Sequence, residues 1–200
     1  MQKTFKKIQN EKIIIILFSF FLCFGCTENQ EEKEIVNEKT ADSIFLLDSK
    51  WQNQEGKEMK LEDLKGKNLV IAMIFTSCQT ACPLLVADMK KVESKIDAKK
   101  LKETSLVLIT IDPENDTPEV LKKYAQQRNM EGEPWIFLRT DLESTREFAN
   151  VLAVKYKKIT PIIFSHSNII SIFNKKGEMI SQEEGTVNFD AIANTVNDLK

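Results

Sequence analysis

Long apolar runs alternate with amphipathic segments along most of this chain. Residues 69–75 and 105–111 are both predominantly apolar, which is typical of strands buried on both faces of a parallel sheet. Apolar residues recur at helical spacing after Pro83, and the segments 118–129 and 141–151 are also predicted helices. This alternation of strands and helices, over about 150 residues, predicts one α/β domain.

Shorter segments extend the predicted domain at both ends. Residues 45–60 suggest an N-terminal hairpin, and residues 135–138 suggest a short strand. A second hairpin is predicted from residue 169 through a turn at 175–177, and a last helix from 189 to 199. The sequence indicates no internal repeat and no second domain.

The first 25 residues differ from the rest of the chain. Lysines precede the apolar run 13–22, which is shorter than a membrane span, and this arrangement is typical of a secretory signal. A small residue before Cys26 resembles a bacterial lipoprotein cleavage site. We therefore expect residues 1–25 to be a lipoprotein signal peptide and Cys26 to carry the lipid. Because Cys23 and Phe24 depart from the usual motif, a plain secretory signal or an uncleaved anchor is the alternative. All three interpretations place the domain outside the cytoplasm, in the bacterial cell envelope.

Residues 26–42 are polar and acidic with few apolar anchors. This composition predicts a flexible tether between the membrane and a folded domain at residues 43–200. Without residues 1–25 the chain has 24 basic and 29 acidic residues, a net charge of −5. Nucleic acid is therefore not an expected partner. The acidic stretch is also a candidate sorting signal, although most such runs are simply solvated.

Two cysteines and the single histidine of the chain carry the candidate chemistry. Cys78 and Cys82 follow the first buried strand, and the histidine is His166. Two thiolates and one imidazole suit copper, particularly Cu(I), better than calcium or magnesium, which prefer oxygen. Ligands in open α/β sheets bind at the carboxyl ends of strands, where this sequence places the cysteine pair. The alternative is that both cysteines are ordinary buried core residues.

The four-residue spacing of Cys78 and Cys82 has a geometric consequence. On a helix, side chains at this spacing have Cβ atoms roughly 5–6 Å apart. A relaxed disulfide needs about 3.5–4.5 Å, so a bridge here would be strained and readily reduced. A metal between the sulfurs relieves this constraint, and a helix N-terminus favours the thiolate that either state needs. Structural zinc is disfavoured because such sites usually need four Cys or His ligands, and the domain offers three.

Three stretches resemble landmarks of the SCO/SenC family of thioredoxin-like copper proteins. They are Phe75-Thr76-Ser77-Cys78 with Cys82-Pro83, then the stretch from Ile111 to Pro118, and then His166-Ser167 before a strand that turns at Gly177. The resemblance implies a thioredoxin-like α/β fold, with a central mixed sheet flanked by helices and an added N-terminal hairpin. It also implies that Cys78, Cys82 and His166 bind copper. Ser165 stands where the family usually has an aspartate.

The resemblance implies a function in the assembly of a respiratory oxidase. The protein would deliver copper to the binuclear copper centre of cytochrome c oxidase, or reduce the thiols of that centre. The expected partners are the oxidase copper subunit or another exported copper or thiol protein, together with the membrane through the lipid anchor.

Two hypotheses of different classes remain. In the first, the protein is a metallochaperone without catalytic turnover. In the second, it is a thiol–disulfide oxidoreductase whose catalytic pair is Cys78 and Cys82, with His166 as an acid or base. The wide cysteine spacing favours the first, because redox thioredoxins usually place two residues between their cysteines. A peroxidase motif is missing from the sequence around either cysteine.

Four further residues have two interpretations each. Asp112 and Asp116 could tune the site electrostatically, but turn and cap roles explain both equally well. Met73 and Met89 could contact copper, but their spacing favours packing in the core.

Overall fold

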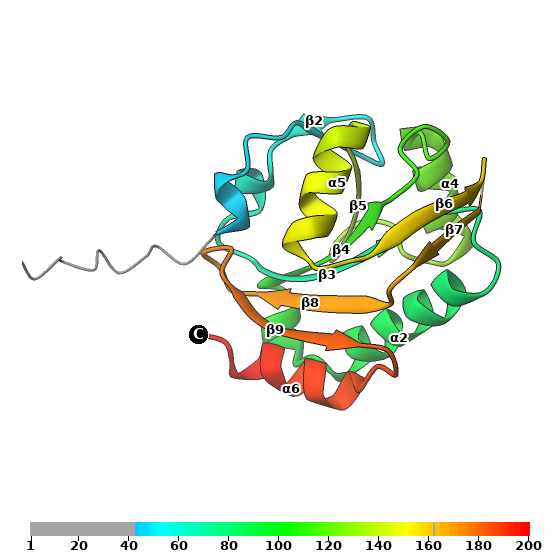
Figure 1. Cartoon of the computed structure of the whole chain (residues 1–200). Coiled ribbons are helices and arrows are strands. Elements are labelled where there is room, and N and C mark those ends of the chain that lie inside the picture. The colour runs from blue at the N-terminus through cyan, green and yellow to red at the C-terminus, as the bar shows by residue number, and fades with distance from the viewer. Residues whose placement is uncertain (1–42, 162) are drawn as a thin grey trace, which may run out of the picture. The chain divides into compact units, whose positions relative to one another are not determined.

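Seven strands form the central sheet, in the order β2-β1-β5-β4-β3-β8-β9 (Figure 1). The computed structural model describes residues 43–161 and 163–200; the predicted signal peptide, Cys26 and the tether lie outside them. The three central strands run parallel, and both pairs of edge strands join them in antiparallel register. In spatial order the strands are β2 (Glu58–Met59), β1 (Trp51–Asn53), β5 (Trp135–Arg139), β4 (Thr104–Thr110), β3 (Asn68–Ile74), β8 (Ile169–Phe173) and β9 (Met179–Glu184). Every residue of β3, β4 and β8 is buried, as their apolar sequences predict.

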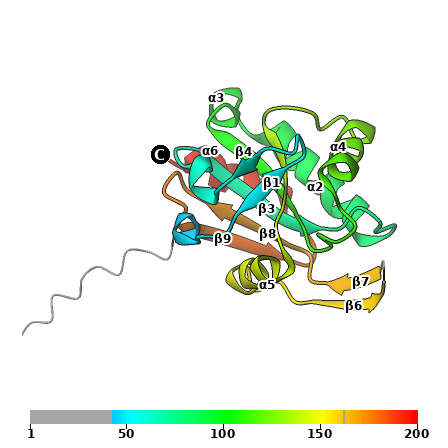
Figure 2. The same ribbon diagram turned by 90° about the horizontal axis from the view of Figure 1, so that it is seen from above.

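Helices cover both faces of this sheet (Figure 2). On one face lie α2 (Ala81–Lys95), α4 (Pro118–Gln127) and α6 (Phe189–Asp198), and α5 (Leu142–Val151) lies on the other. A lysine of α2 donates to the carbonyl at the end of α4, Lys90 Nζ to Arg128 O at 2.8 Å. On the opposite face, Trp51 of β1 meets Phe148 of α5 edge-on, with ring centroids 5.3 Å apart. The mixed α/β thioredoxin-like fold with its N-terminal hairpin is therefore confirmed.

Short polar residues start the helices where the sequence predicts. Thr117 caps α4 by accepting from Val120 N, with Pro118 in the first turn, and Asp141 caps α5 by accepting from Ser144 N. The remaining short helical elements are η1 (Ile44–Leu46), η2 (Leu61–Leu64) and α3 (Ala98–Leu101). None of the helices in residues 43–161 and 163–200 combines the length and hydrophobicity that crossing a bilayer requires.

One continuous hydrophobic core extends from Ile44 to Val196. It includes Met73 and Met89, which are 1% and 0% exposed, so both methionines pack in the core. Gly177 closes the turn between β8 and β9 at φ +78°, where an added Cβ would lie 2.6 Å from Ser43 Oγ. This turn also accepts a hydrogen bond from Ile44 N, which joins the start of residues 43–200 to the same continuous core.

A second, two-stranded sheet was not expected from the sequence. It is a hairpin of β6 (Tyr156–Thr160) and β7 (Ile163–His166), with Tyr156 paired to His166. Figure 2 shows it on the same side of the central sheet as α5. Its side chains are mostly exposed, and β6 contains Lys157 and Lys158. The hairpin therefore lacks the long apolar run that identifies a buried strand.

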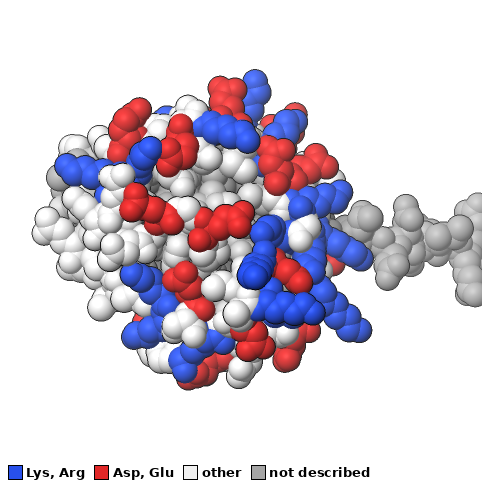
Figure 3. All heavy atoms as spheres, turned by 180° about the vertical axis from the view of Figure 1, so that it is seen from behind, with Lys and Arg blue, Asp and Glu red and all other residues white. Residues whose placement is uncertain are grey.

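The face of the molecule opposite to that of Figure 1 has a mixed charge. Lysine and arginine side chains are interspersed there with aspartate and glutamate (Figure 3). This face therefore does not offer the continuous basic surface that binds a nucleic-acid backbone.

Candidate metal and thiol site

The two cysteines lie where β3 passes into α2. Cys78 is partly exposed in the connecting loop, where its N–H donates to Phe75 O at 3.2 Å. Cys82 is 0% exposed in the first turn of α2. Because α2 begins at Ala81, Cys78 precedes the helix, and the Cβ spacing of two residues one helical turn apart does not apply to this pair. Instead, the N–H of Cys82 donates to the Sγ of Cys78 over 3.4 Å.

His166 reaches the cysteines from the end of the hairpin. Its Nε2 lies 3.3 Å from the Sγ of Cys82, and its Nδ1 lies 3.0 Å from the carbonyl oxygen of Ser167. Because a carbonyl only accepts, Nδ1 carries the proton and the lone pair of Nε2 faces the Cys82 thiol. Burial lowers the pKa of His166, against a smaller opposing effect of the Ser167 bond, so the neutral ring is favoured. A backbone carbonyl thus orients the ring.

The two thiols differ in acidity. Burial raises the pKa of Cys82 to about 12. Burial also acts to raise the pKa of Cys78, but hydrogen bonds from the backbone N–H groups of Cys82, Thr80 and Ala81 outweigh it, and the net shift is downward. Cys78 is therefore the more acidic and more accessible thiol, as its place before a helix N-terminus predicts.

Aromatic contacts hold the hairpin against the body of the domain. The ring of Phe75, at the end of β3, lies 5.2 Å from Phe164 of β7 and 5.8 Å from His166, measured between centroids. Both distances fall in the range of favourable aromatic pairs. Since the hairpin belongs to a separate sheet, these rings, together with the Lys158–Glu114 ion pair, fix His166 relative to the cysteines.

Asp116 braces the loop that carries Cys78. Its carboxylate is 1% exposed and accepts hydrogen bonds from the N–H and hydroxyl of Thr76 and from the hydroxyl of Thr110. Burial raises the pKa of Asp116, against the opposing effect of these bonds. It therefore joins the carboxyl ends of β3 and β4 beneath the site. Asp112 has a turn role instead, since it accepts from Asn115 Nδ2 at 2.8 Å and 3.0 Å.

The contact between Cys82 and His166 suits a shared metal ion. Tetrahedral bonds of about 2.3 Å to sulfur and about 2.0 Å to nitrogen, the zinc values, hold these two atoms about 3.5 Å apart. The separation here is 3.3 Å. In the described part of the chain no group of three or more His, Cys, Asp or Glu side chains lies close enough to hold a metal as it stands. Ligation by all three predicted residues thus requires their side chains to move closer together than they are in this structure.

Two parts of this site were not predicted. The hairpin that carries His166 has no apolar run, and the role of Asp116 depends on contacts across 40 positions of sequence. One signal was available: Thr76 and Thr110 both end buried parallel strands, and such ends meet at one edge of a sheet. A buried acid near them in space could have been expected to join them.

Comparison with known proteins places the chain in a family. The SCO1/SenC family model matches residues 38–200. A relative from Bacillus subtilis (strain 168), "SCO1 protein homolog", is 35% identical over 122 residues, which are 61% of this chain and 58% of that protein's length. The matched segment thus spans less than two thirds of that relative.

Solved structures agree with this assignment. A SCO1/SenC family lipoprotein from Bacillus anthracis str. Ames is 27% identical with a TM-score of 0.68, over 75% of this chain and 91% of that one. BsSco, described as a member of the Sco family of cytochrome c oxidase assembly proteins with a disulfide switch, is 29% identical with a TM-score of 0.66, over 78% and 93%. ScoI from Bradyrhizobium japonicum, solved with copper bound, shares the fold at 21% identity, with a TM-score of 0.65 over 76% and 97%. The chain therefore belongs to the SCO1/SenC family.

Proposed function

We propose that this protein is a copper carrier of the bacterial cell envelope that holds one copper ion through Cys78, Cys82 and His166. Copper is its cargo, passed on by ligand exchange to a respiratory copper site such as the binuclear centre of cytochrome c oxidase. Membership of the SCO1/SenC family supports the choice of metal and of recipient.

The observation that carries this proposal is the contact between Cys82 and His166. A buried thiol and an unprotonated imidazole nitrogen face each other over 3.3 Å, a hydrogen-bonding distance that is also close to the separation a shared metal would set. A thiolate and an imidazole are soft to borderline donors that suit copper. Copper would also displace the thiol proton of Cys82, which is otherwise held tightly because the side chain is buried.

The third ligand is suited to transfer. Cys78 lies in a loop, is partly exposed, and has the lower pKa of the two thiols. It can therefore leave the copper or regain it at less cost than Cys82, which is fixed in the first turn of α2. We assign Cys78 as the ligand that an incoming thiol of the recipient replaces first.

The location of this carrier follows from the leader. We propose that residues 1–25 are a lipoprotein signal peptide, that Cys26 is acylated, and that residues 26–42 tether the domain to the membrane. The Bacillus anthracis relative is described as a lipoprotein, which supports this arrangement.

A second candidate function is thiol–disulfide exchange, and one observation favours it. Cys78 is accessible with a lowered pKa, whereas Cys82 is buried with a pKa raised to about 12. In thiol–disulfide exchange, one thiolate attacks the partner's disulfide and a second thiol then resolves the mixed disulfide. Cys78 suits the first role and Cys82 the second. Reduction of the recipient's cysteines would precede copper loading, so both activities can serve one assembly.

Transfer to a defined recipient tests the proposed function. Residues 43–200 loaded with one equivalent of Cu(I) are mixed with a metal-free, reduced, soluble domain that carries a binuclear copper centre. We expect copper to move to the recipient. The two proteins are then separated by chromatography, and the copper content of each is measured. If residues 43–200 kept their copper, and the metal-free protein reduced an oxidised recipient, the thiol–disulfide oxidoreductase function would replace the copper-carrier function.

A further inference from the structure

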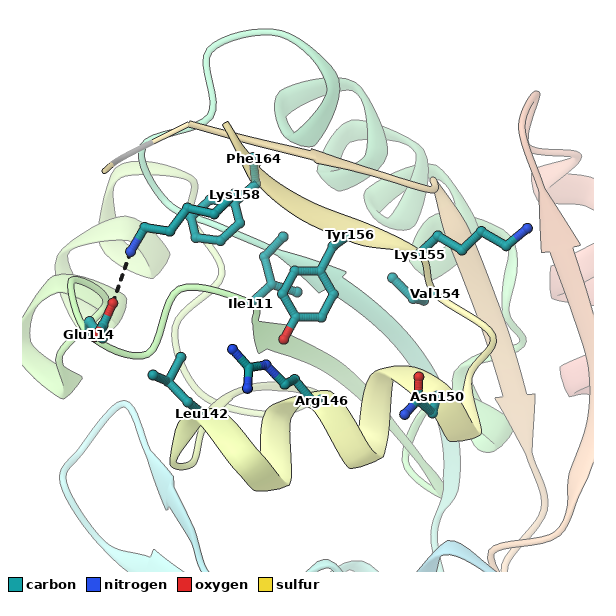
Figure 4. A pocket seen from close by; sticks show the side chains of 10 residues that line it. All are labelled: Ile111, Glu114, Leu142, Arg146, Asn150, Val154, Lys155, Tyr156, Lys158 and Phe164. Carbon is teal, nitrogen blue, oxygen red and sulfur yellow. Dashed lines mark hydrogen bonds and ion pairs between the residues drawn. The ribbon is translucent and has the colours of Figure 1, made fainter. Parts of the chain in front are cut away.

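A pocket of about 550 Å³ lies between α5 and the hairpin. Side chains of α5 form one wall, and Tyr156, Lys158 and Phe164 of the hairpin form the other (Figure 4). None of the residues proposed to bind copper lines it.

The polar groups of this pocket are mainly hydrogen-bond donors. Arg146 of α5 points toward the hydroxyl of Tyr156 (Figure 4), and an arginine has five donor N–H bonds and no acceptor. No carboxylate of residues 43–161 and 163–200 lies within ion-pair distance of Arg146. The Tyr156 hydroxyl is buried, and within the same residues its proton has no acceptor.

The single carboxylate that lines the pocket is already neutralised. Glu114 pairs with Lys158, with Oε2 and Nζ 2.9 Å apart. Lys155 adds a further positive charge at the rim, although its ammonium points away from Arg146 (Figure 4). The pocket thus has an excess of positive charge in a chain whose net charge is −2.

An acidic group with a hydrocarbon stem fits this lining. A carboxylate would pair with the Arg146 fork and accept the Tyr156 proton, which gives this buried donor an acceptor. Apolar side chains line both walls and the base of the pocket as well: Ile111, Leu142, Val154 and the ring of Phe164. An inorganic anion would leave this apolar surface uncovered, whereas an aspartate or glutamate side chain would cover it.

The location indicates where such a group would come from. Tyr156 pairs with His166 across the hairpin, and Phe164 contacts the Phe75 ring that also packs on His166. We propose that this pocket binds an acidic side chain of the protein that exchanges copper at Cys78, Cys82 and His166, with Arg146 as its ion-pair partner. The inference rests on the proposed function for the identity of the partner. A carboxylate held there would join α5 to the strand opposite His166 and so fix the hairpin while the partner is docked.

The first test uses a defined probe without copper. ¹⁵N-labelled, reduced, metal-free residues 43–200 are titrated with the blocked tripeptide acetyl-Leu-Glu-Leu-amide and with its glutamine counterpart. We expect saturable NMR shifts at Arg146, Tyr156 and Phe164 with the glutamate peptide only. Arg146→Gln should weaken this binding about tenfold, and Arg146→Lys by less, because lysine keeps the charge but not the bidentate fork.

The matched control is Lys157→Gln. It also removes one positive charge, at a position next to Tyr156 on β6. Lys157 is exposed and does not line the pocket. Equal weakening by Lys157→Gln and Arg146→Gln would reduce the effect to overall charge and overturn the proposal. Equal binding of the glutamine peptide, or competition by sulfate as strong as by the glutamate peptide, would also overturn it.

The second test concerns the partner. In the copper-transfer assay, Arg146→Gln should slow transfer about tenfold and leave the copper affinity of this protein unchanged, while Lys157→Gln leaves both unchanged. Unchanged transfer in Arg146→Gln would contradict the docking of the partner at this pocket. If the protein bound no copper but still bound the glutamate peptide, the carrier function would fail and the pocket would remain.

Discussion

The Sγ of Cys82 and the Nε2 of His166 lie 3.3 Å apart, although 84 positions of sequence separate the two residues. They come from two separate sheets of the protein, since Cys82 starts the helix that follows β3 and His166 ends β7 of the hairpin. Their contact therefore depends on how the hairpin packs against the domain. The ring of Phe75 contacts both His166 and Phe164, which lie on the same strand, β7.

Loosening the hairpin should weaken copper retention. Phe164→Ala removes an aromatic pair worth about 0.5–1.5 kcal/mol, so we expect Cu(I) affinity to fall roughly threefold to tenfold. The change is measured by competition with a Cu(I) chelator at fixed pH. Ile163→Ala is the control, because Ile163 is 51% exposed and precedes Phe164 on the same strand, where side chains alternate between faces. An equal loss in both variants would show that the Phe75–Phe164 contact does not hold the ligand.

Alkylation should separate the two thiols by pH. Cys78 has a lowered pKa, so its thiolate persists at lower pH than that of a free cysteine and is lost as the pH falls through that lowered value. Cys82 has a pKa raised to about 12, so it stays a thiol across the neutral range. Iodoacetamide at about pH 7 should therefore modify Cys78 first, as read by peptide mass spectrometry. Faster modification of Cys82 would contradict these assignments.

Removing the brace beneath the site should destabilise the fold. Asp116→Ala leaves the Thr76 N–H and two hydroxyls without their buried acceptor, which should lower the free energy of unfolding by about 2–4 kcal/mol. Urea denaturation of residues 43–200 measures the change. Asp88→Ala is the comparison, because Asp88 makes only a short-range ion pair with Lys91 on the surface of α2. Similar stabilities of the two variants would contradict the bracing role.

The lipid anchor is tested through Cys26. Cys26→Ser removes the only thiol that the proposed lipoprotein signal would acylate, so the protein should leave the membrane fraction. Fractionation of cells that express the full chain, followed by immunoblotting, measures this. Membrane association that persists in a cleanly processed variant would favour the uncleaved anchor.

The strands and helices of the core could be predicted because each has a signal within its own stretch of sequence. The apolar run of β3, the Thr117-Pro118 start of α4 and the Asp141 start of α5 are local signals of burial and capping, and the structure confirms each. The positions of Cys78 and Cys82 at the end of β3 followed from the same reasoning. His166 joined them as the single histidine of the chain, and the family resemblance implied that all three bind copper.

The rest depends on contacts between distant parts of the chain. The hairpin was missed because Lys157 and Lys158 interrupt any apolar pattern, and its position comes from the Phe75 and Phe164 rings instead. Helix α2 begins at Ala81, so Cys78 lies outside it. The chain first turns at Thr76 and Ser77, where Asp116 accepts a hydrogen bond from Thr76 N. A buried acid and two threonines that are far apart in sequence leave no periodic signal.

The most direct test of the copper site is a Cu(I) competition titration of reduced residues 43–200, compared with His166→Ala and with His166→Ala in the presence of free imidazole. We expect one equivalent of Cu(I) to bind the unmodified domain, and loss of the Nε2 ligand to weaken it at least about tenfold, with partial rescue by imidazole. The fold should be unchanged, because His166 is partly exposed at the end of the hairpin. Equal affinity of the unmodified and His166→Ala domains would contradict the assignment of Cys78, Cys82 and His166 as the copper site.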